Sequence, residues 1–268
     1  MQLYTLASGS SGNCALLTGG AKLLVDAGIS CRKITTRLAQ TGVHPRELDG
    51  ILITHTHADH IGGLRVLLRR SPLPVYASEA AGEDLLRRVP EADGLLRPFR
   101  PGETFSLGGV EIRTFATSHD APGSVGYRFS DGEQTAAVVT DLGYLSDCVR
   151  EALAGRVDVA LLEANHDPDW LRSGPYPYPL QERVLGRYGH LSNEACGELA
   201  IYLAQAGASV LVLGHLSREN NTPERARETV RRMLEEADCP PVRLSVAASD
   251  ELCGPFAVPV RGMGARCG

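Results

Sequence analysis

The stretch that decides the fold runs from residue 51 to residue 63 and reads ILITHTHADHIGG. Its apolar strand ends in four side chains of metal-binding types, which are His55, His57, Asp59 and His60. Side chains alternate on extended backbone, so His55 and His57 point the same way. As the chain turns into the predicted helix that follows, Asp59 and His60 reach a neighbouring point. This spacing predicts two adjacent metal ions, because a merely polar loop would gather these residues only by chance.

Three further candidate ligands, His119, Asp141 and His215, each follow another run of strand-forming residues. A single histidine in a loop is more often structural than a ligand. Together with the 51–63 stretch, however, these three residues supply the ligands that two divalent ions still lack. The predicted ligands of the first metal are His55, His57 and His119. The predicted ligands of the second metal are Asp59, His60 and His215, with Asp141 bridging the two ions.

Strand-like and helix-like runs recur along the chain, which predicts an α/β fold. The predicted strands are Leu23–Val25, Ile51–Thr54, Val110–Ala116, Ala137–Thr140, Val159–Leu162 and Val210–Gly214. The predicted helices are Cys31–Gln40, Gly63–Arg70, Glu79–Val89, Leu145–Leu153, Asn193–Ala206 and Pro223–Ala237. Ser192 and Thr222 are the expected N-caps of the last two helices. Mixed sheets with helices on their outer faces are the layered arrangement that this pattern predicts.

The chain of 268 residues is predicted to form one domain, 1–268, with a peripheral tail over 259–268. Three prolines and two tyrosines predict that Leu171–Pro179 is a stiff, extended loop rather than a helix. The seven cysteines are scattered and include no CxxC pair, which argues against a disulfide framework or a cysteine-based zinc site. Without a signal peptide or a membrane-length apolar run, we expect a cytoplasmic protein with no membrane partner.

The formal net charge is −5, which argues against a general polyanion-binding surface. Two divalent ions would nevertheless outweigh the negative charges of Asp59, Asp141 and a bridging hydroxide, and leave a local positive field in a cleft.

The motif HxHxDH, followed by a later His, a later Asp and a terminal His, resembles the metallo-β-lactamase fold superfamily. This resemblance implies a four-layer αββα sandwich of two mixed sheets, and a role for Asp26 in supporting the metal loop. Within the superfamily, several short segments resemble the YycJ/WalJ-type branch, whose members are described as DNA exonucleases. These segments are Leu6–Asn13, Glu163–Asp167, Pro175–Pro179 and Gly189–Glu194.

Such a site would use two divalent ions, Zn²⁺, Mn²⁺ or Fe²⁺, and a hydroxide that bridges them as nucleophile. Asp59 and His190 are the candidate catalytic residues, with His190 as phosphate binder or general acid; a structural hydrogen bond is the alternative for His190. The candidate substrate-binding residues are His166, His190, Asn13 and Arg172. For His166 a loop or supporting role is favoured. Arg183 and Arg187 are further candidates for holding phosphates, and Tyr176 or Tyr178 for stacking on a base.

The leading hypothesis is a two-metal phosphodiesterase that acts on nucleic acid, most simply a 5′–3′ exonuclease at DNA ends. The alternative is a thioester or lactone hydrolase of the glyoxalase II kind, which can share all seven ligands. A common β-lactamase would place Cys where Asp141 stands. A non-catalytic member or redox partner is a third possibility, although such chains replace or lose ligands that are present here. The native metal, DNA against RNA, strand polarity and oligomeric state remain open at this point.

Overall fold

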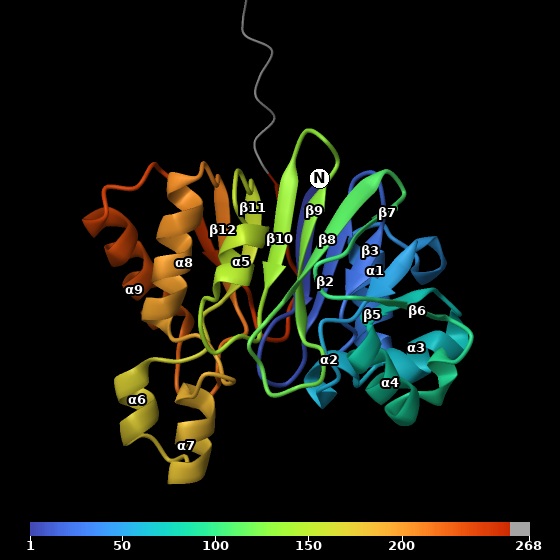
Figure 1. The fold of residues 1–268 in the computed structure, drawn as a ribbon, viewed down its shortest axis with the longest axis horizontal. Helices are drawn as coiled ribbons and strands as arrows, with labels where there is room; N and C mark the ends of the chain where they lie inside the picture. The colour runs from blue at the N-terminus through green and yellow to red at the C-terminus, as the bar shows by residue number, and fades with distance from the viewer. Residues whose placement is uncertain (258–268) are drawn as a thin grey trace, which may run out of the picture.

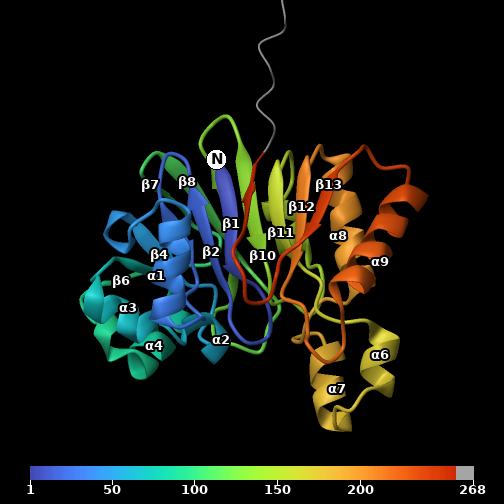
Figure 2. The same cartoon turned by 180° about the vertical axis from the view of Figure 1, so that it is seen from behind.

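Two β-sheets lie face to face in the middle of the computed structural model, which describes residues 1–257 (Figures 1 and 2). The first sheet contains, in spatial order, β14 (Cys253–Phe256), β1 (Gln2–Ala7), β2 (Cys14–Thr18), β3 (Leu23–Val25), β4 (Gly50–Leu52), β5 (Val75–Ser78) and β6 (Leu96–Phe99). The second contains β13 (Arg243–Val246), β12 (Val210–Gly214), β11 (Val159–Glu163), β10 (Thr135–Val139), β9 (Val125–Ser130), β8 (Val110–Ala116) and β7 (Thr104–Leu107). Each sheet mixes parallel and antiparallel pairs, with the parallel pairs in one half.

Helices cover the outer faces of both sheets (Figure 1). On the first sheet they are α1 (Cys31–Gln40), α2 (Ala58–Ile61), α3 (Leu64–Arg70) and α4 (Glu79–Arg88), with 3₁₀ turns at Pro45–Glu47 and Pro90–Ala92. On the second sheet they are α5 (Asp147–Ala152), α8 (Asn193–Gln205) and α9 (Pro223–Glu236). Between α5 and α8 the chain also forms α6 (Pro168–Ser173) and α7 (Tyr178–Leu185). The short helices α6 and α7 project beyond the sandwich at its lower edge (Figures 1 and 2).

Alternation along the strands produces three apolar layers. In β3, Leu24 packs in the cluster that contains α1, whereas Leu23 and Val25 pack between the two sheets. The period of two in a strand places successive side chains on opposite faces, so a strand that is buried on both faces is apolar throughout. A third cluster joins the second sheet to α5, α8 and α9. The predicted αββα sandwich of two mixed sheets is therefore confirmed.

The expected caps are present, since Ser192 accepts from the amide of Ala195 and Thr222 accepts from the amide of Arg225. The prediction for Leu171–Pro179 is wrong in part, because both ends of that segment are helical. The predicted tail 259–268 lies outside the described residues. Within residues 1–257, no helix combines the length and apolarity that crossing a bilayer requires.

Candidate metal centre

The seven predicted ligands meet at the edge of the sandwich where the strands of both sheets end. His55, His57, Asp59 and His60 stand on the segment that leads from β4 through α2, near the lower edge of Figure 1. The other three side chains come from the second sheet: His119 lies in the β8–β9 connection, Asp141 after β10 and His215 after β12. Because parallel strands end on the same side of a sheet, residues far apart in sequence converge here.

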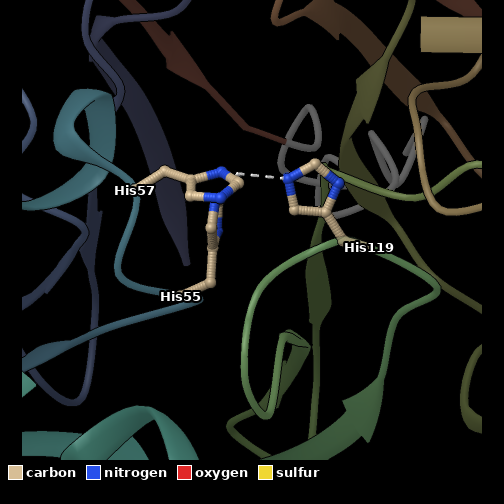
Figure 3. A group of neighbouring side chains, drawn as sticks. All are labelled: His55, His57 and His119. Carbon is tan, nitrogen blue, oxygen red and sulfur yellow. Dashed lines mark hydrogen bonds between the residues drawn. The ribbon is translucent and has the colours of Figure 1, made fainter. Parts of the chain in front are cut away.

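The first group comprises His55, His57 and His119, whose donor nitrogens lie within 4.8 Å of one another. Nδ1 of His57 lies 3.2 Å from Nε2 of His119, the contact drawn as a dashed line in Figure 3. The Nδ1 atom of His119 is turned the other way, 3.0 Å from the carbonyl oxygen of Gly189, which fixes Nε2 toward the group. Three imidazoles that share one point in this way form a fitting set for a divalent transition metal.

The second group comprises Asp59, His60 and His215, again with donor atoms within 4.8 Å of one another. Oδ2 of Asp59 lies 3.3 Å from Nε2 of His60 and 3.5 Å from Nε2 of His215. Asp141 faces both groups, because its Oδ1 atom is 3.4 Å from Nε2 of His215 and 3.8 Å from Nε2 of His119. The geometry therefore offers two neighbouring positions for ions with one carboxylate between them.

Three donor atoms of these groups are buried and have no hydrogen-bond partner within the described residues. They are Nε2 of His55, Oδ2 of Asp141 and Nε2 of His215. A buried polar atom without a partner costs about 1–3 kcal/mol, so several of them around one point call for a further group. A divalent cation accepts electron pairs from imidazole and carboxylate alike, and these residues fit that group.

Charge in this cluster is balanced by acidic side chains. Burial opposes protonation of His215, but Asp141, Asp59 and Glu163 raise the pKa of that imidazole to about 10. Burial alone would raise the pKa of Asp141. The surrounding imidazoles, His215 and His60 above all, outweigh burial and hold the pKa of this carboxyl well below its usual range. The carboxylates that attract protons to these rings attract a metal cation in the same way.

Asp26 supports the second group from behind. Its Oδ1 atom accepts from the amide of Thr54, and its Oδ2 atom accepts from the Thr54 hydroxyl and lies 2.8 Å from Nδ1 of His60, so that Nε2 of His60 faces the other ligands. Asp26, Asp141 and His215 all have a positive φ, near 60°. This left-handed conformation is uncommon outside glycine and lets each residue turn sharply out of its strand into the centre.

Glu163 provides the matching support in the second sheet, a role that sequence reasoning missed. The side chain is fully buried at the end of β11, and its Oε1 atom lies 2.6 Å from Nδ1 of His190 and 3.0 Å from Nδ1 of His215. Its Oε2 atom accepts from the amides of Leu142 and Leu191. Both oxygens are thus occupied, so Glu163 orients two imidazoles instead of binding metal. Its place at a strand end, like that of Asp26, and its position in the segment Glu163–Asp167 noted above are the signals that pointed to it.

The centre opens into a cleft of about 200 Å³. His57, Asp59, His119, His190 and His215 line its floor. The α7 helix and the segments on either side of it form a wall, with residues Tyr176, Leu180, Arg183, Val184, Tyr188 and Gly189. Asp120 was not foreseen: its Oδ2 atom accepts from Nε of Arg183, and its Oδ1 atom lies 3.6 Å from Nε2 of His57.

The predicted substrate contacts are placed unequally. His190 lines the cleft, whereas Asn13 lies beneath it and donates from Nδ2 to Oδ2 of Asp59 at 3.1 Å. His166 is only 1% exposed and is absent from the cleft wall, so its position does not support direct contact with a substrate. Arg172 lies on α6 outside the cleft and faces Asp169 at 3.5 Å, and its position does not support such contact either.

Comparison with known proteins agrees with this architecture. The family model described as Beta-lactamase superfamily domain matches residues 21–216. The chain is 43% identical over 242 residues to the exodeoxyribonuclease WalJ of Streptococcus pneumoniae, covering 87% of this chain and 88% of that protein. It is 37% identical over 240 residues to the exodeoxyribonuclease YycJ of Bacillus anthracis, covering 88% and 90%. The metallo-β-lactamase fold protein YhfI of Bacillus subtilis superposes with a TM-score of 0.69 at 19% identity, covering 95% and 100%, which shows the shared fold.

Proposed function

We propose that this chain, which belongs to the metallo-β-lactamase superfamily and within it to the WalJ/YycJ branch, is a metal-dependent exonuclease that hydrolyses DNA from a strand end. The observation that carries the proposal is the convergence of seven side chains of metal-binding types, four of which line a cleft with one helix along its wall. The high identity to two exodeoxyribonucleases over nearly their full lengths supports DNA as the substrate.

In this proposal His55, His57 and His119 hold one ion, Asp59, His60 and His215 hold a second, and Asp141 contacts both. Imidazole-rich sites of this kind suit Zn²⁺ or Mn²⁺, and Fe²⁺ is compatible with them. When bound, two such ions supply an acidified water as nucleophile and neutralise charge on the phosphate. Asn13 keeps Asp59 oriented through its amide hydrogen bond.

His190 is the proposed general acid toward the leaving 3′ oxygen. Its Nδ1 atom is engaged by Glu163 at 2.6 Å, which leaves Nε2 as the free nitrogen of a ring that lines the cleft. A buried carboxylate in this position holds the orientation of the imidazole, as a proton donor to an alkoxide requires. Glu163 is therefore the proposed positioning residue of this step.

The α7 wall is the proposed reason for attack at a strand end. Leu180 and Val184 lie one helical turn apart on the cleft side, and Tyr176 and Tyr188 flank them. Apolar and aromatic side chains of this kind pack against a terminal base and sugar. A helix along one side of the metal cleft would also obstruct a DNA strand that continued past the cleft on that side. This obstruction favours the release of terminal nucleotides.

The test compares substrates on one preparation. Protein stripped of metal is reconstituted with Zn²⁺ or Mn²⁺ and assayed on single- and double-stranded DNA labelled at the 5′ or the 3′ end, on RNA, and on a thioester. We expect metal-dependent release of nucleotides from the 5′ end of DNA, and loss of both metal and activity in His55→Ala. Thioester turnover without nucleic-acid cleavage would overturn the proposal. Release from the 3′ end would reverse the proposed polarity.

Six cysteines within the described residues are unpaired, which fits a reducing compartment, so we propose a cytoplasmic location.

A further inference from the structure

A second, larger groove is lined by residues of α1 and of the turn that joins β13 to β14. Figure 2 shows α1 and β13, the elements that border it. Its volume is about 990 Å³, and we call it the basic groove. Arg32, Lys33 and Arg37 of α1 line one side, and Asp250 lines the other. A smaller hollow of about 240 Å³ continues it past Ser30 and Lys33 to Arg218.

The basic groove and its extension adjoin the catalytic cleft. Two loops separate them, and each loop contributes neighbouring residues to both sides. Ser10 and Ser217 line the metal cleft, whereas Ser11 and Arg218 line the hollow that leads into the groove. The two loops are tied together, because Nη2 of Arg218 donates to the hydroxyl of Ser11 at 2.8 Å. A DNA strand that crossed this pair of loops from the metal cleft would reach the smaller hollow first and then the basic groove.

The local charge is opposite to that of the whole chain. The net charge of the protein is −5, yet the groove and its extension present four basic side chains, Arg32, Lys33, Arg37 and Arg218, against Asp250 and Glu251. Asp250 pairs with Lys33 at 2.6 Å and with Arg37 at 3.0 Å. Within residues 1–257 neither Arg32 nor Arg218 forms an ion pair, and both are exposed. Unpaired guanidinium groups along a groove favour phosphates.

None of the described residues that line the groove is aromatic, in contrast to the cleft wall with Tyr176 and Tyr188. Stacking on bases requires aromatic faces, whereas neutralising phosphates requires only cations. We infer that the basic groove holds the sugar–phosphate backbone of a single DNA strand whose terminal nucleotide occupies the metal cleft. This inference rests on the proposed exonuclease function and adds to it the path of the undigested strand.

The experiment measures binding of a fluorescent single strand of about 12 nucleotides, made resistant to cleavage by phosphorothioate linkages, to the metal-loaded protein. Arg32→Ala/Arg218→Ala should bind about tenfold more weakly. The slope of log affinity against log salt should flatten by about 1.4, because each lost phosphate contact removes about 0.7 for a single strand. Arg231→Ala on α9, which removes an exposed arginine far from the groove, should match the wild type.

A second measurement separates this inference from the proposed function. The advantage in kcat/KM of a long strand over a dinucleotide should shrink about tenfold in the double variant. Arg32→Lys/Arg218→Lys should restore most of it, which a merely misfolded alanine variant cannot imitate. If the wild type degrades DNA but the double variant binds and degrades it like Arg231→Ala, the groove has another occupant and the inference is wrong. If the wild type neither binds nor degrades DNA, both proposals fail.

Discussion

Asp26 and Glu163 are two buried carboxylates at the ends of strands in opposite sheets, and they do different work. Asp26 engages one imidazole, that of His60, together with the amide and hydroxyl of Thr54. Glu163 engages two imidazoles, His190 and His215, together with two amides. Both therefore hold a predicted metal ligand, but only Glu163 also reaches a residue that lines the cleft outside the ligand set.

The pKa values of Asp26 and Glu163 also differ in direction. Burial raises the pKa of Asp26 above its usual value despite the nearby His60. Burial also raises the pKa of Glu163, but His190 and the hydrogen bonds from both imidazoles outweigh it and bring the value to about 2. A carboxylate that stays ionised can stabilise positive charge on a neighbouring ring while that ring moves a proton. The first sheet thus supplies support alone, whereas the second links that support to His190, the proposed proton donor.

The largest effect should come from Glu163→Gln. The amide side chain cannot accept from both imidazoles and both backbone amides, so His190 and His215 lose their orientation together. We expect kcat/KM on DNA to fall about 10³–10⁴-fold and metal affinity to fall about 10–100-fold. Steady-state assays and metal analysis check this, with a thermal melt to confirm folding. A variant with normal turnover when saturated with metal would remove Glu163 from the catalytic step.

His190→Ala should have the next largest effect. The loss of a general acid lowers kcat about 10²–10³-fold, while metal content stays intact because His215 keeps its bond to Glu163. In the double variant with Glu163→Gln, the two losses should not add in free energy, since both remove the same proton transfer. Metal loss in His190→Ala would instead make that histidine a ligand or its support.

Asp26→Asn should lower metal affinity about 10–100-fold, because Nδ1 of His60 loses its carboxylate partner. Turnover of the fully loaded enzyme should change only a few-fold. Titration with Zn²⁺ against a competing chelator measures the first quantity, and assays at saturating metal measure the second. A large fall in kcat at saturation would erase the contrast with Glu163.

The smallest effect concerns Asp84, a carboxylate on α4 that accepts from the hydroxyl of Thr56 in the metal loop at 2.5 Å. The Thr56 hydrogen bond, with help from Arg88, lowers the pKa of this carboxyl. A lowered folded-state pKa stabilises the protein above the unfolded value and loses that contribution as pH falls through the folded value. Asp84→Asn should therefore cost about 1 kcal/mol of unfolding free energy at neutral pH and little in acid. Urea unfolding of chelated protein at both pH values checks the sign, and an equal cost at both would contradict it.

The sequence predicted the layered fold and brought out all seven side chains of the cluster, because both depend on local signals. Apolar runs that end abruptly in His or Asp mark strand ends, and strand ends converge. Partnerships between distant residues leave no such signal. Glu163 contacts His190 and His215, which lie 27 and 52 positions further along the chain, and Asp120 contacts Arg183, which lies 63 positions further along. These contacts depend on tertiary geometry that no spacing rule states.

The wrong prediction for Leu171–Pro179 has a related cause. Proline breaks the interior of a helix, but Pro168 and Pro179 occupy the first turns of α6 and α7. The backbone amide at these positions has no hydrogen-bond partner within the helix, so its absence does not destabilise the helix. Asp167 accepts from the amide of Trp170 and starts the first of these helices. Arg172 is thereby carried away from the cleft, whereas Arg183 is carried to it.

The distribution of the candidate ligands between the sheets has a thermodynamic consequence. His55, His57, Asp59 and His60 follow strands of the first sheet, and His119, Asp141 and His215 follow strands of the second. A ligand that binds only the folded chain stabilises it by an amount that grows with its concentration, about 4 kcal/mol at a thousandfold excess over Kd. An ion shared between the layers therefore acts as a cross-link between two halves of the polypeptide. We therefore expect the cohesion of the sandwich to rise with the concentration of the free metal ion.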